Sequence, residues 1–159
     1  MTRTILNEIL SLFGRRDLVL LVPIIGYFVG VFIHEYAHII VAMNLGIRID
    51  SVTFSVLEGA KVWVNIEGVD VTIGGLLMLG FIGGIIEGIF YAVMTLKVRE
   101  MSVMALGSLT YGVAESFRVA LRQPDFIMFK FARWFLLFTM LVTVLLIGRR
   151  HYRMCLYDN

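Results

Sequence analysis

Two histidines four residues apart are the part of this chain best suited to chemistry. His34 and His38 lie in the segment His-Glu-Tyr-Ala-His, and on an α-helix this spacing places both side chains on one face. Two imidazole nitrogens on one face can bind a single tetrahedral metal ion. Glu35 follows the first histidine, which is the position of the general base in the HExxH zinc signature. The segment therefore predicts a zinc site with a catalytic carboxylate beside it.

The surroundings of this segment are apolar. Residues 18–33 and 39–43 carry no charged side chain, so the two histidines and Glu35 lie inside a stretch long enough to cross a membrane. Ionisable groups are costly in lipid, which makes them functional candidates by default. The alternative is that His34 and His38 are core histidines that hydrogen-bond without a metal.

The composition indicates a polytopic membrane protein with a single domain, residues 1–159. Of the 159 residues 59% are hydrophobic and only 16% are charged, and the mean hydropathy is +0.88. In soluble domains about a quarter of the residues are charged, and the core of a soluble domain of this size could not bury so many apolar side chains. The formal net charge of +2 and the scattered basic residues exclude nucleic acid as a partner. The partner that the composition indicates is the lipid bilayer.

The pattern along the chain predicts an all-α membrane protein with about four transmembrane helices and one β-hairpin. Predicted spans cover residues 18–43, 72–96, 101–122 and 129–148, after an amphipathic segment at 1–16 and before a polar tail at 149–159. Between the first two spans, residues 47–71 alternate apolar and polar side chains, which predicts a hairpin with its turn near 57–60. The same pattern allows a third short strand at 69–71.

A catalytic zinc site needs a third protein ligand, and depth in the membrane selects among the carboxylates. The histidine motif is centred seven residues before Met43, which is ~10 Å from the hairpin-side surface at helical rise. Glu115 lies seven residues before Arg122, again ~10 Å from that surface, whereas Glu87 lies ~22 Å from it. We therefore predict Glu115 as the third ligand. Glu87 is the rival ligand, and an ion pair with Arg118 is the structural alternative for Glu115.

This layout resembles the site-2 protease family of intramembrane zinc metalloproteases. The shared features are a metal motif within a membrane helix, a following hairpin, a glycine-rich span and an acidic residue in the third span, and they cover residues 18–122. The resemblance implies a three-helix catalytic core with His34 and His38 as zinc ligands and Glu35 as the base. It places Glu115 where the family usually supplies the aspartate of an Asp-Gly pair; here Ser116 follows instead of glycine.

The resemblance implies one zinc ion per chain and hydrolysis of a peptide bond within or near a transmembrane segment of a membrane-protein substrate. Zinc would activate water, and Glu35 would act as general base. The hairpin would hold the unwound substrate by strand addition, or would be a structural plug. The alternative from another class is a zinc-binding membrane protein without peptidase activity, a regulator or a carrier. Polar residues gathered at one depth favour the hydrolytic site over a carrier.

The orientation in the membrane rests on two opposing indications. Four spans place both termini on one side, and that side carries eight of the 14 Lys and Arg residues against six on the hairpin side. The positive-inside rule then favours cytoplasmic termini. The resemblance instead implies that the hairpin and the site lie near the cytoplasmic face, and we adopt that orientation.

Overall fold

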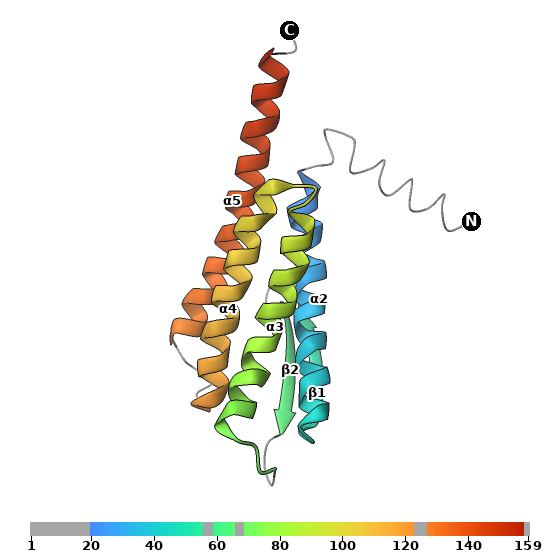
Figure 1. Ribbon diagram of the computed structural model, residues 1–159, viewed down its shortest axis with the longest axis vertical. Coiled ribbons are helices and arrows are strands. Elements are labelled where there is room, and N and C mark those ends of the chain that lie inside the picture. The colour runs from blue at the N-terminus through green and yellow to red at the C-terminus, as the bar shows by residue number, and fades with distance from the viewer. Residues whose placement is uncertain (1–19, 56–58, 66–68, 123–126, 158–159) are drawn as a thin grey trace, which may run out of the picture.

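The computed structural model describes residues 20–55, 59–65, 69–122 and 127–157. In this part of the chain, long helices run alongside one another and a two-stranded hairpin lies against one end of the bundle (Figure 1). The helices and strands are α2 (Leu21–Asn44), β1 (Arg48–Ser55), β2 (Gly59–Asn65), α3 (Ile73–Met94), a short 3-10 helix η2 (Arg99–Met101), α4 (Ser102–Ala120) and α5 (Ile127–Tyr157). The amphipathic segment predicted at 1–16 lies outside the described residues.

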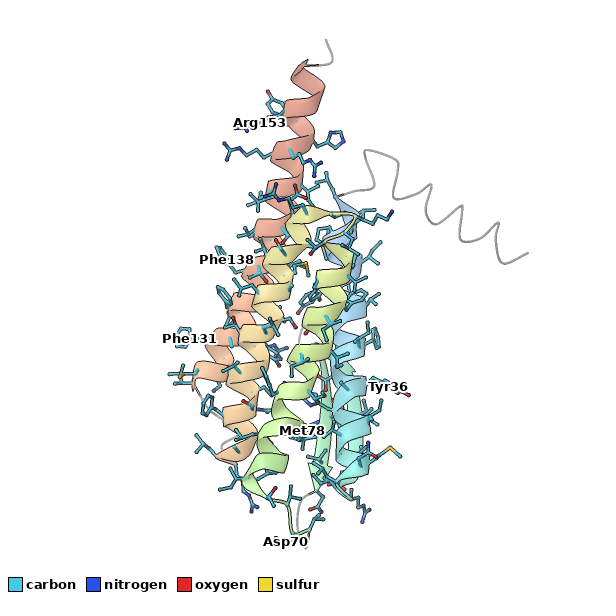
Figure 2. All side chains as sticks on the ribbon, viewed as in Figure 1. Tyr36, Asp70, Met78, Phe131, Phe138 and Arg153 are labelled. Carbon is cyan, nitrogen blue, oxygen red and sulfur yellow. The ribbon has the colours of Figure 1, made fainter. Side chains whose placement is uncertain are left out.

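Among the described residues, three helical segments are long and apolar enough to cross a membrane, namely Leu21–Asn44, Ile73–Met94 and Lys130–Arg153. Large apolar side chains cover their outward faces, and Figure 2 shows Phe131 and Phe138 pointing away from the bundle. The prediction of a multi-span helical protein with a hairpin is therefore supported. The predicted third span, helix α4, does not reach the same apolarity, because it carries glycines, hydroxyl side chains and two charged residues on its packed face.

Helix α5 is longer than the predicted fourth span. It continues from Ile127 to Tyr157, so the segment 149–157, predicted as a polar tail, is helical and extends past the ends of the other helices (Figure 1). The arginines that end its apolar stretch do not end the helix, since arginine is a good helix former. Near this point Arg150 Nη1 lies 3.3 Å from Glu100 Oε1.

Helices α2 and α3 pack through complementary faces. On α2 the facing residues recur every four positions, as Gly26, Gly30, His34 and His38, and on α3 they recur as Leu79, Gly83, Glu87 and Tyr91. Small residues of one helix lie opposite large ones of the other. A Cβ at Gly30 would collide with the hydroxyl of Tyr91, and a Cβ at Gly83 would lie 2.5 Å from His34 Nε2. The glycines thus make room for the polar side chains.

Helices α3 and α4 approach backbone to backbone. A Cβ at Gly84 would lie 2.5 Å from the Cα of Gly112, and a Cβ at Gly80 would collide with the backbone of Ser116. Such contact between small residues is the usual means of close helix packing in membranes. It places the face of α4 that carries Glu115 next to the histidines of α2.

The hairpin is antiparallel, with Val52 paired to Val62 and Ser51 to Trp63. A register shift between Ile49 and Ser51 leaves Asp50 as an extra residue, a β-bulge that lets Ile49 and Val52 both face inward. Ile49 and Val64 pack on a cluster around Val41, Ala42, Ile47 and Leu79. The third strand allowed at 69–71 does not form, because this segment turns tightly, with Val71 N donating to Val69 O. Of the turn predicted at 57–60, residues 57 and 58 lie outside the described residues, whereas Gly59 and Ala60 belong to strand β2.

Candidate metal centre

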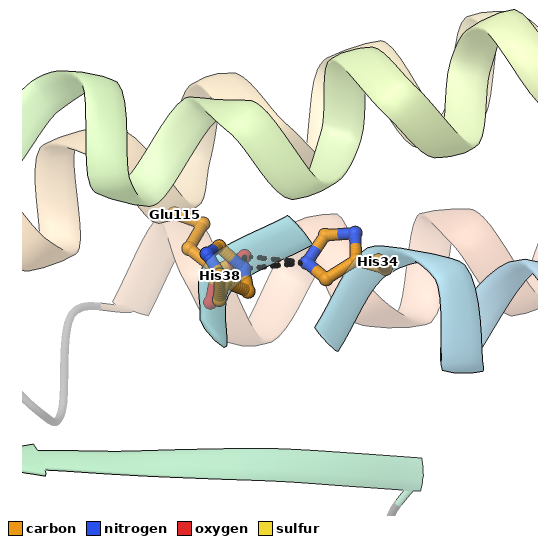
Figure 3. A group of neighbouring side chains, drawn as sticks. All are labelled: His34, His38 and Glu115. Atoms are coloured by element: carbon orange, nitrogen blue, oxygen red, sulfur yellow. Dashed lines mark hydrogen bonds and ion pairs between the residues drawn. The ribbon is translucent and has the colours of Figure 1, made fainter. Parts of the chain in front are cut away.

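Three buried side chains from two helices bring one nitrogen or oxygen atom each to a common point (Figure 3). His34 Nε2 lies 3.0 Å from His38 Nε2 and 2.8 Å from Glu115 Oε2, and His38 Nε2 lies 3.2 Å from the same oxygen. The three atoms thus form a small, nearly equilateral triangle. Of the residues that the structure describes, this is the group that could hold a metal ion.

The hydrogen bonds behind the two histidines decide which ring nitrogen carries the proton. His34 Nδ1 lies 3.0 Å from a carboxylate oxygen of Glu87, and His38 Nδ1 lies 2.6 Å from the backbone oxygen of Leu79. A carbonyl oxygen and an ionised carboxylate can only accept, so each Nδ1 donates. In the neutral rings both Nε2 atoms then present lone pairs to the common point.

The donor set fits a metal cation. Two imidazole lone pairs and one carboxylate oxygen that meet without a donor between them repel one another unless a proton or a cation lies among them. Zinc bonds of about 2.0–2.2 Å in a tetrahedron would separate neighbouring ligand atoms by about 3.3–3.5 Å, slightly more than the observed spacing. Histidine nitrogen and carboxylate oxygen are also ligands that zinc accepts in catalytic sites. The atoms therefore need to move apart by only a few tenths of an ångström.

Glu115 contacts both the two histidines and Arg118, so its position is compatible with both alternatives that the sequence left open. Its Oε2 faces the two histidines, whereas its Oε1 accepts a hydrogen bond from Arg118 Nη2 at 3.0 Å. The ion pair with Arg118 fixes the carboxylate so that one oxygen points at the common point. Its role as a metal ligand stays a prediction, but the geometry that this role requires is present.

Glu87 lies closer to the histidines than residue counting indicated. The count placed it ~22 Å from the hairpin-side surface, too deep for the site. In the structure its Oε2 reaches His34 Nδ1, because His34 is the deeper of the two histidines and the long glutamate side chain spans the remaining distance. Glu87 contacts Nδ1 of the His34 ring, on the side opposite the triangle formed by the two Nε2 atoms and Glu115 Oε2.

Glu35 lies at the boundary between α2 and the hairpin. Its side chain is buried, and its carboxylate has the backbone N–H of Val62, in β2, as a hydrogen-bond partner. Val62 therefore directs its N–H away from β1 and toward the helix. The predicted base thus adjoins strand β2, and it interacts electrostatically with His34, His38 and Glu115.

Three further residues of the site were not predicted. Tyr91 and Ser108 donate hydrogen bonds to Glu87 at 2.8 Å each, and the ring of Tyr111 lies against that of His34 with 5.2 Å between centroids. A signal for Tyr91 was available in the sequence, since Gly83, Glu87 and Tyr91 recur at four-residue spacing on one face of α3. Ser108 and Tyr111 lie on a different helix, and their spacing carried no comparable signal.

Comparison with protein-family models, curated proteins and solved structures finds no match to this chain. The class of protein is therefore defined by the fold and the site. The part of the chain that the structure describes has three helices long and apolar enough to cross a membrane, a small hairpin, and a buried histidine–histidine–glutamate group that could hold a metal ion.

Proposed function

We propose that this chain is an intramembrane zinc metalloprotease of the site-2 protease type. The observation that supports this most is the convergence of His34 Nε2, His38 Nε2 and Glu115 Oε2 within 3.2 Å, together with the buried carboxylate of Glu35, which interacts electrostatically with all three residues. Three protein ligands leave a fourth tetrahedral position for water, which is the arrangement of hydrolytic zinc sites. One zinc ion per chain is expected.

The roles of the residues follow from their chemistry. Bound zinc would supply Lewis-acid polarisation of the scissile carbonyl and would make water acidic enough to attack near neutral pH. Glu35 would accept a proton from the attacking water and pass it to the amine that leaves when the C–N bond breaks. Arg118 would keep Glu115 oriented by holding its second oxygen.

The hairpin is proposed to hold the substrate. A transmembrane helix satisfies its own backbone hydrogen bonds, so its peptide bonds become accessible only where it unwinds. The outer edge of β2 directs the Val62 N–H toward Glu35, and an extended segment pairing with that edge would lie beside the base. The substrate class is therefore a membrane protein with a locally unwound transmembrane segment.

Helix α4 is proposed to cross the membrane as well, which gives four spans. Its 19 residues rise ~28 Å, close to the ~30 Å thickness of the hydrocarbon core. Its polar face packs on α3 and would thus be shielded from lipid. With four spans the termini share one side, and we place the hairpin side and the site toward the cytoplasm.

A second candidate is a zinc-binding membrane protein without peptidase activity, a regulator or a carrier. The observation that favours it is the extension of the polar network beyond the ligands, through Glu87 to Tyr91, a turn further along α3. A carrier needs polar groups at successive depths. Such a protein would not depend on Glu35 as a base, so replacement of that carboxylate separates the two functions.

The test uses purified protein in liposomes with a transmembrane peptide that contains helix-weakening residues. Glu35→Gln should hold about one zinc ion per chain and cleave nothing, because glutamine cannot accept the proton. Glu100→Gln is the matched control, since that carboxylate lies near Arg150, at the end of the bundle away from the hairpin, and cleavage should persist. Cleavage by Glu35→Gln at the wild-type rate would exclude the proposed mechanism.

A further inference from the structure

The described part of the chain holds a third buried carboxylate besides Glu35 and Glu115, and the proposed mechanism uses it neither as ligand nor as base. Glu87 is 1% exposed, and three donors converge on it from three helices. Its Oε2 accepts from His34 Nδ1 at 3.0 Å and from the hydroxyl of Ser108 at 2.8 Å, and its Oε1 accepts from the hydroxyl of Tyr91 at 2.8 Å.

We propose that Glu87 is a positioning residue for the metal centre, which acts through His34 and does not bind the metal. The proposal rests on the metal site of the proposed function but not on its peptidase activity. By accepting the Nδ1 proton, Glu87 fixes both the tautomer and the rotation of the imidazole ring. His34 Nε2 then directs a lone pair toward His38 and Glu115, where a metal would bind.

The surroundings of Glu87 fit this role better than they fit simple packing. A leucine of similar volume would fill the space with no polar group to satisfy, and burial of a carboxylate is unfavourable without hydrogen bonds. Helix α2 instead provides Gly30 at this level, where a Cβ would lie 2.9 Å from Glu87 Oε1 and would collide with the hydroxyl of Tyr91. The space, the acceptor and the two hydroxyl donors are thus arranged around one hydrogen bond to His34.

Replacement of the carboxylate by a neutral amide should weaken the hold on the ligand nitrogen, because hydrogen bonds to an ionised acceptor are roughly twice as strong as neutral ones. If Glu87 did not hold the proton on Nδ1, the ring could carry it on Nε2 and direct an N–H at the metal position. Hydrogen-bond partners of this kind typically contribute 10–100-fold to metal affinity. Tyr91 and Ser108 should contribute less than Glu87, because each makes one hydrogen bond to the carboxylate and none to the imidazole.

The experiment compares Glu87→Gln, Tyr91→Phe and Ser108→Ala with wild type in detergent. Zinc affinity is measured by competition with a chromophoric chelator, ligand geometry by the absorption spectrum of the cobalt-substituted protein, and fold by thermal unfolding of the zinc-free protein. Glu87→Gln should bind zinc about 10–100-fold more weakly and alter the cobalt spectrum, while the zinc-free unfolding temperature is retained. A merely structural role would lower the unfolding temperature and leave affinity and spectrum unchanged, which would overturn the proposal.

The other possible outcomes separate the role of Glu87 from the proposed peptidase activity. If Glu87→Gln does not fold, the two milder variants must still weaken zinc binding, and wild-type affinity in both would overturn the proposal. Wild-type protein that binds zinc but cleaves nothing would refute the peptidase and leave the role of Glu87 intact. Wild-type protein that cleaves, with Glu87→Gln binding zinc at full affinity, would refute the role of Glu87 alone. Wild-type protein that binds no zinc would overturn both.

Discussion

Gly83 of α3 should control whether His34 can bind a metal. A Cβ placed there would lie 2.5 Å from His34 Nε2 and 2.6 and 2.7 Å from two ring carbons. Carbon atoms pack at about 3.5–4.0 Å, so the ring would have to move by roughly 1 Å. The ring cannot move freely, since it is 3% exposed and lies against Tyr111. Metal sites require metal–ligand distances within about 0.2 Å of their ideal values, so Gly83→Ala should prevent His34 from binding the metal.

The expected magnitudes differ for metal binding and for stability. Loss of a metal ligand should weaken zinc binding more than loss of the hydrogen-bond partner of that ligand does. Zinc affinity should therefore fall by more than about 100-fold. The free energy of unfolding of the zinc-free protein should fall by no more than about 2 kcal/mol. Overpacking destabilises by about 1–3 kcal/mol, and alanine in place of glycine in a helix returns up to about 1 kcal/mol.

The assay is chelator competition for zinc together with thermal unfolding of the zinc-free protein. Gly74→Ala is the control on the same helix, because a Cβ there would contact only Thr72 Oγ1, at 3.8 Å. It should keep wild-type affinity. Wild-type zinc affinity in Gly83→Ala, with normal unfolding, would refute the reasoning, because it would mean that His34 Nε2 does not face the metal.

Three further predictions test other parts of the account. Glu115→Gln should weaken zinc binding more than Glu87→Gln does, since only Glu115 directs an oxygen at both histidine Nε2 atoms; the reverse order in chelator competition would contradict the ligand assignment. Val62→Pro should reduce cleavage while zinc content stays at wild type, because proline removes the N–H that faces Glu35; full cleavage would return the hairpin to a structural role. The single cysteine, Cys155, should react with a membrane-impermeant maleimide in intact cells, since the termini are proposed to lie opposite the cytoplasm; reaction only after permeabilisation would reverse the orientation.

Local spacing accounts for the parts of the site that could be predicted. His34 and His38 share a face because four residues make slightly more than one helical turn, and the structure does bring them together with Glu115. Residue counting located Glu115 well because α2 and α4 run in the same direction and end near the same surface. Glycines at four-residue spacing on α3 do pack closely against α4, but the spacing alone does not indicate which helix is the partner.

The features that the sequence did not predict correctly were missed for physical reasons. Counting along a helix gives depth but neither the direction nor the reach of a side chain, so the contact between Glu87 and His34 was missed. Hydropathy marks where an apolar segment ends, not where a helix ends, so α5 was predicted too short. The bulge at Asp50 breaks the period-two pattern of β1, which a strict alternation cannot represent.

We propose that His34, His38 and Glu115 form a zinc site, and X-ray absorption at the zinc edge of the purified protein is a direct test of that claim. We expect about one zinc ion per chain with nitrogen and oxygen ligands at about 2.0–2.2 Å and the outer-shell scattering of two imidazole rings. The double variant His34→Ala/His38→Ala should lose the metal. Zinc bound through sulfur at about 2.3 Å, or zinc retained by the double variant, would contradict the claim.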